Sequence, residues 1–121
     1  MPPDSSDPLA QQLGQLRREY LRDSISRVEE LRRLRSRLAQ EGPVVLPDLR
    51  QAFHRLAGSG GSYGFPDVSA RSRDGEHLVV NLQSAGTNPS AADMASLDQA
   101  IESVAGAFAD AARTFDSSLG S

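Results

Sequence analysis

Apolar residues recur every three or four positions over most of this chain, and no other feature limits its fold as strongly. Residues 94–115 keep this spacing without a break. Residues 9–38 show it too, with Arg and Glu between the apolar positions, as on an exposed helical face. No segment alternates apolar and polar residues long enough for a half-buried strand. The first stripe comprises Leu9, Leu13, Leu16, Tyr20, Val28, Leu31, Leu34 and Leu38, with Leu21 and Ile25 filling it in.

Helix-breaking residues divide this pattern into four helices. Each break pairs Pro or Gly with a residue that favours a helix start or end. Ser90 and Asp93 have the spacing of a capping box, and Gly14 is where the long first helix is expected to bend. The breaks lie at Asp7-Pro8, Gly42-Pro43, Pro47-Asp48, Gly64-Phe65-Pro66 and 84–90.

Short connections between amphipathic helices favour antiparallel neighbours. We therefore predict an all-α protein, an antiparallel four-helix bundle in up-down-up-down order with a long N-terminal helix. The bundle is predicted over residues 7–116, with a disordered N-terminus over 1–6 and a frayed tail over 117–121.

Composition narrows the function classes. The chain has 121 residues, 38% of them apolar, which suits one domain with one core. Its net charge of -3 gives no sign of nucleic-acid binding, and no apolar run is long enough for a membrane span. Cys is absent, which excludes a disulfide scaffold and a thiolate metal site. We expect a cytoplasmic monomer, and the use of Arg as the only strongly basic residue is typical of a bacterial source.

The second predicted helix carries His54 on the side away from its apolar stripe. At about 100° per residue, Leu49, Ala52 and Leu56 fall roughly opposite His54, with Phe53 at the flank. His54 is therefore predicted to face solvent. The residues expected to share or border its face are Arg50, Gln51, Arg55, Ala57, Gly58 and Gly61.

Small residues around an exposed imidazole lower the stability of the helix but leave the ring accessible for a reaction. Gly inside a helix costs about 1 kcal/mol against Ala, so Gly58 and Gly61 need another reason to be there. They leave the imidazole unshielded, and a partner's active site can close over it. Imidazole is also a competent nucleophile near neutral pH. An exposed, unhindered histidine on a rigid helix meets the requirements of reversible phosphoryl transfer.

Residues 54–64 resemble the motif of the histidine-containing phosphotransfer (HPt) domain family, roughly H-x-x-K-G followed by small residues and a Gly. His54, Gly58 and Gly64 match it in register, and Leu56 matches its usual apolar position. The resemblance extends over the whole chain, with a long helix first, the motif helix second and two more after it. It implies a four-helix bundle in which His54 is the phospho-acceptor.

One position departs from the family pattern, because Ala57 stands where the family has a Lys. In the family, that Lys lies near the phosphoryl group and supplies positive charge. Arg50 is on the right face to replace it, whereas Arg55 lies about a quarter-turn away. The choice between these two arginines stays open at this point.

The resemblance also implies partners. A receiver domain's phospho-aspartate or a hybrid sensor histidine kinase would load His54, and a second receiver aspartate would unload it. We expect no cofactor of the chain's own, because the receiver would supply Mg²⁺. The chain would be a phosphocarrier in a two-component phosphorelay and not an enzyme. Its expected partner surface comprises Arg50, Gln51, Arg55, Ala57, Gly58, Gly61 and Gly64.

Other interpretations of these motifs are weaker. A metal site made of His54 and His77 lacks a third ligand at helical spacing. The Gly-rich run lacks the Gly-Lys-Ser/Thr ending of a phosphate loop, and no strand precedes it. The arginines of 27–37 are interrupted by glutamates, as on a solvated helix. Two rival functions remain: a helical interaction module that binds a signalling partner without relaying phosphate, and a coiled-coil dimerisation domain.

Overall fold

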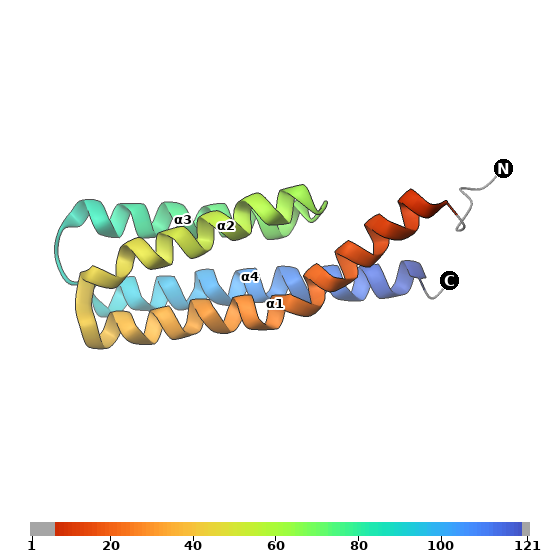
Figure 1. Ribbon diagram of the computed structural model, residues 1–121. Helices are drawn as coiled ribbons and strands as arrows, with labels where there is room; N and C mark the ends of the chain where they lie inside the picture. Colours follow the sequence, from red (N-terminus) through yellow and green to blue (C-terminus); the bar gives the residue numbers. More distant parts are fainter. Residues whose placement is uncertain (1–6, 120–121) are drawn as a thin grey trace.

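The computed structural model describes residues 7–119, and this range forms a bundle of four α-helices with one short 3-10 turn. Figure 1 shows each helix running antiparallel to the one before it. The all-α four-helix bundle predicted from the sequence is thus confirmed. The elements are α1 (Pro8–Glu41), η1 (Gly42–Val45), α2 (Leu46–Ser62), α3 (Pro66–Ala85) and α4 (Ala91–Leu119).

The predicted domain ends can be followed only in part. The segment 1–6, expected to be disordered, lies outside the described residues, as do residues 120–121 of the expected tail. The backbone of α4 is helical as far as Leu119, so the last helix continues past its expected end at residue 116.

The helix starts follow the capping signals of the sequence. The Asp7 carboxylate accepts a hydrogen bond from the Leu9 amide at 3.0 Å, with Pro8 at the first helical position. Ser90 and Asp93 form a reciprocal capping box, with bonds of 3.0 and 2.9 Å. The long first helix is not split at Gly14, because α1 is one uninterrupted helix.

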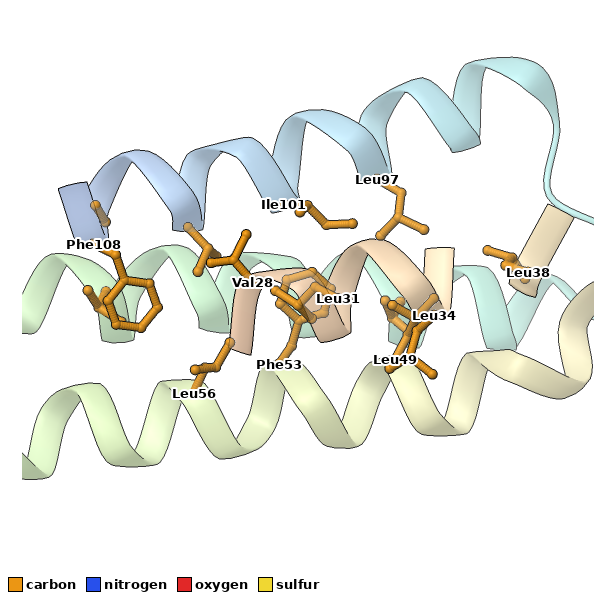
Figure 2. Close-up of a cluster of buried hydrophobic side chains, with 14 of the residues drawn as sticks. Val28, Leu31, Leu34, Leu38, Leu49, Phe53, Leu56, Leu97, Ile101 and Phe108 are labelled. Atoms are coloured by element: carbon orange, nitrogen blue, oxygen red, sulfur yellow. The ribbon is translucent and has the colours of Figure 1, made fainter. Parts of the chain in front are cut away.

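Leucine, valine and phenylalanine side chains from all four helices fill one core. Figure 2 shows how those of α1, α2 and α4 meet along the bundle axis. Burying each of these side chains contributes about 1.5–3 kcal/mol against leaving it in water. The labelled core residues are Val28, Leu31, Leu34, Leu38, Leu49, Phe53, Leu56, Leu97, Ile101 and Phe108.

The first turns of α1 depart from the predicted core stripe. Leu9 is 74% exposed, and Leu13 and Leu16 are nearly half exposed. The beginning of α1 and the end of α4 extend past the turn between α2 and α3 (Figure 1), so no second pair of helices covers them there. Ile25 is also exposed, because Ser24 and Val28 take the buried positions beside it. The periodicity identified a helix correctly but overestimated how much of it is buried.

Two glycines allow α2 and α3 to pack closely. A Cβ on Gly60 would lie 2.9 Å from the Val68 side chain and 3.0 Å from the Ser69 amide nitrogen. A Cβ on Gly75 would overlap the ring of Phe53. The Ser69 hydroxyl also donates a 2.6 Å hydrogen bond to a backbone carbonyl of α2. These contacts fix the position of α3 along α2.

The turn that joins α2 to α3 is held by α1. Gly64 has φ +85°, a left-handed conformation that favours glycine. The Arg17 guanidinium donates a 2.9 Å hydrogen bond to the Tyr63 carbonyl, and Tyr20 stacks on Tyr63 at 4.6 Å between ring centroids. Burial raises the pKa of the Tyr20 hydroxyl, which shares a 2.7 Å hydrogen bond with Ser59. Three contacts with α1 therefore anchor the C-terminal end of α2.

Candidate functional site

His54 projects from α2 towards solvent and is hydrogen-bonded to one residue of α3. Its side chain is 67% exposed. Its Nδ1 lies 2.8 Å from Oε2 of Glu76, whose side chain is only 16% exposed. A half-buried carboxylate therefore holds one ring nitrogen, while the ring itself stays open to solvent.

The phase of α2 explains why these two side chains meet. Phe53, predicted at the flank of the apolar stripe, is fully buried, whereas Ala52, predicted inside the stripe, is only partly buried. The buried face is thus rotated from the predicted one, and His54 lies about 120° from its centre and not directly opposite. This places His54 at the border with α3, within reach of Glu76.

The contact with Glu76 determines which nitrogen of His54 is free to react. An ionised carboxylate can only accept hydrogen bonds, so Nδ1 must carry the proton that it donates. In the neutral ring, Nε2 then holds the lone pair. The arrangement presents Nε2 as a nucleophile on an exposed and positioned imidazole.

The structure places most of the predicted neighbours of His54 on the outer surface of α2. Arg50, Gln51 and Arg55 are exposed, and the first two line a shallow depression together with His54 and Glu76. These residues are therefore accessible to a partner that approaches His54.

Two predicted members of the partner surface lie elsewhere. Ala57 is only 8% exposed, because the rotation of α2 turns it towards the core. It offers little surface to a partner, and its role as a contact residue stays a prediction. Gly64 lies in the α2–α3 turn beside Arg17, where its left-handed backbone conformation accounts for the glycine.

Gly58 differs from the glycines that pack against α3. A Cβ at this position would meet no atom within 4 Å, although the residue lies inside a helix one turn after His54. A Cβ on Gly61 would make only ordinary contact, 3.6 Å from the Ser69 hydroxyl. Internal packing therefore explains Gly60 and Gly75 but not Gly58, and the open space above Gly58 adjoins the imidazole.

Glu76 was not identified from the sequence. The apolar stripe of α3 is weak, and the sequence alone does not give its position along α2. The signal that could have found Glu76 is Gly75, since a glycine in a helix suggests a close approach, here to Phe53. His77, the next residue, is exposed.

Within residues 7–119, no group of three His, Asp or Glu side chains is placed to hold a metal ion. None of the helices in this range is both long and apolar enough to span a bilayer.

The fold and site together define a class of protein: an antiparallel helical bundle that displays one unshielded histidine on its second long helix. The sequence profile of the Hpt domain family matches residues 9–107, and the chain belongs to this family. No curated protein and no solved structure gives a significant match. Hpt domains are phosphocarriers of two-component signalling that interact with receiver domains and histidine kinases.

Proposed function

We propose that this chain is a phosphocarrier of a bacterial, cytoplasmic phosphorelay. Nε2 of His54 accepts a phosphoryl group from a receiver aspartate or a sensor kinase and passes it to a receiver aspartate. The observation that carries this proposal is the hydrogen bond between Nδ1 of His54 and Glu76, which leaves Nε2 exposed. The family match supports it.

The transfer follows from this geometry. The Nε2 lone pair attacks phosphorus, the N–P bond forms, and the P–O bond to the partner's aspartate breaks with its electrons returning to that carboxylate. Nδ1 keeps its proton, so the ring becomes cationic as the bond forms. The Glu76 carboxylate stabilises this positive charge from 2.8 Å away. The partner's Mg²⁺ would stabilise the charge on the phosphoryl oxygens. Donation to the second aspartate reverses these changes.

Replacing Glu76 tests this role of the carboxylate. Glu76→Gln keeps an oxygen that can accept the Nδ1 hydrogen bond but removes the negative charge. We expect phosphorylation of His54 to slow by about tenfold, the order expected when a hydrogen bond to a charged group is weakened. The rate is measured by mass spectrometry after addition of phosphoramidate, a small-molecule phosphodonor. An unchanged rate would remove Glu76 from the mechanism.

Replacing Gly58 separates stability from access. Gly58→Leu places a side chain in open space at an exposed helical position, so the free energy of unfolding should rise by up to about 1 kcal/mol. The same side chain would shield the imidazole, and transfer from a loaded receiver domain should slow by at least about tenfold, as expected for a misplaced reacting group.

The matched control for this change is Gly106→Leu in α4. Gly106 also has no atom within 4 Å of a Cβ, and it lies on another helix. It should show the same gain in stability without loss of transfer. Equal transfer rates in the two variants would show that the space above Gly58 has no part in docking.

The second candidate function is a helical module that binds a signalling partner without relaying phosphate. The observation that favours it is Ala57, which stands where the family has a Lys. Calorimetric titration with receiver domains, combined with phosphate uptake, distinguishes the two. Binding without uptake by the wild-type chain would support the module and contradict the relay.

A further inference from the structure

A phosphoryl group on His54 would bring a charge close to -2 to the surface of α2. Such a group is stabilised by cationic donors that make charge-assisted hydrogen bonds. The sequence offers Arg50 and Arg55 for this role, and both lie on α2 itself. The neighbouring helix α3 offers a third arginine, Arg73, next to the same surface.

Arg73 lies at the junction of α2 and α3. Its Nη2 donates a 3.2 Å hydrogen bond to the Ser69 hydroxyl. That hydroxyl in turn donates a 2.6 Å hydrogen bond to the Ala57 carbonyl. The guanidinium is therefore held against the segment of α2 that directly follows His54.

The face of α3 that carries Arg73 is the one that borders the site. At about 100° per residue, Ser69, Arg73 and Glu76 fall within roughly 60° of one another around the helix. Ser69 contacts Ala57 and Glu76 contacts His54, so Arg73 lies between two fixed contacts with α2. Along α2, these contacts place Arg73 between the levels of His54 and Ala57.

No carboxylate among the described residues neutralises the charge of Arg73. Several other arginines, such as Arg32, Arg35 and Arg37, are paired with carboxylates. Arg73 is exposed and forms no ion pair with any residue that the structure describes, and its hydrogen-bond partner Ser69 is a neutral hydroxyl. Its remaining N–H groups are available, since a guanidinium carries five donors in a planar fork.

We propose that Arg73 is a binding residue for the phosphoryl group carried by His54. Its guanidinium donates hydrogen bonds to the phosphoryl oxygens on Nε2 of His54, which lie over Gly58. This inference rests on the proposed function, because it assumes that His54 carries phosphate. It assigns the main counter-charge to α3 and not to Arg50, which lies one turn before His54.

The test is the lifetime of phosphohistidine in the full chain. Phosphoramidate modifies an accessible imidazole without a protein partner, so the chain is loaded with it in a His77→Gln background. Loss of the phosphoryl group is then followed at neutral pH. Arg73→Gln should shorten the half-life about two- to fivefold, the effect of losing a solvent-exposed ion pair. Arg73→Lys should restore much of the wild-type half-life, because it keeps the positive charge. A purely structural role of Arg73 would not explain this recovery.

Arg50→Gln is the matched comparison on the other side of His54. A normal half-life in Arg50→Gln, with a short one in Arg73→Gln, supports the inference. A wild-type half-life in Arg73→Gln overturns it, as does a half-life that Arg73→Lys fails to improve. Failure of the relay proposal is recognised by a different measurement. In that case, the loaded wild-type chain would pass no phosphate to receiver domains, whatever the half-life of its phosphohistidine.

Discussion

His54→Gln is expected to abolish phosphate uptake while leaving the fold intact. The side chain is 67% exposed and contributes nothing to the core, so its replacement affects stability only through the hydrogen bond to Glu76, by about 1 kcal/mol. Gln has no imidazole nitrogen and cannot form the N–P bond. Uptake is measured as acid-labile label after incubation with receiver domains that carry phosphate and Mg²⁺, and folding by thermal unfolding followed with circular dichroism.

His77→Gln is the matched control for this change. His77 is exposed on α3 and directly follows Glu76 in the sequence, so it offers a second accessible imidazole on the same chain. The control should take up phosphate like the wild type. Acid-labile label that persists in His54→Gln, or that disappears in His77→Gln, would contradict the assignment of the phospho-acceptor.

Gly75→Leu is expected to lower the free energy of unfolding by about 3 kcal/mol. Any Cβ at this position would overlap the ring of Phe53, which is fully buried. The larger side chain would push α3 away from α2, and Glu76 would move away from His54. Phosphorylation by phosphoramidate should therefore slow as well, even where the variant is still folded.

Urea unfolding of Gly75→Leu beside Gly106→Leu measures this effect. Gly106 meets no atom within 4 Å, so the same substitution there should stabilise the helix by up to about 1 kcal/mol. The two variants should thus change the free energy of unfolding in opposite directions, because only the side chain at position 75 overlaps another residue. Equal stability would show that the contact between Gly75 and Phe53 does not set the distance between α2 and α3.

The contacts of α2 with its neighbours explain how a surface histidine is held in place. Gly60 and Gly75 allow the close packing on α3, and Ser69 bonds to the backbone of α2. At the far end, Arg17 holds the Tyr63 carbonyl. The helix that carries His54 is thereby fixed along its length, while the imidazole remains free at the surface.

Helices and the exposed histidine could be predicted from the sequence, because both depend on local patterns. The caps at Asp7 and Ser90 are set by residues close in sequence, and the period of the apolar stripes needs no knowledge of the partner helix. His54 could be identified because the small residues after it are unfavourable in a helix unless they serve another purpose.

The details that depend on contacts between helices could not be predicted. Phe53 is buried because α3 has a glycine opposite it, and this rotates α2 enough to bury Ala57 and to bring His54 next to Glu76. Leu9 is exposed because α2 and α3 are too short to cover the beginning of α1. Both outcomes depend on the relative lengths and positions of helices, which a periodic pattern does not contain.

The most direct test of the central claim is to determine which atom carries the phosphoryl group. The chain is loaded by a phosphorylated receiver domain, and an NMR experiment that correlates phosphorus with the ring nitrogens of nitrogen-labelled histidine is recorded. A correlation to Nε2 of His54 is the expected result, because Glu76 occupies Nδ1. A phosphoryl group on Nδ1 of His54, or on His77, would contradict the mechanism.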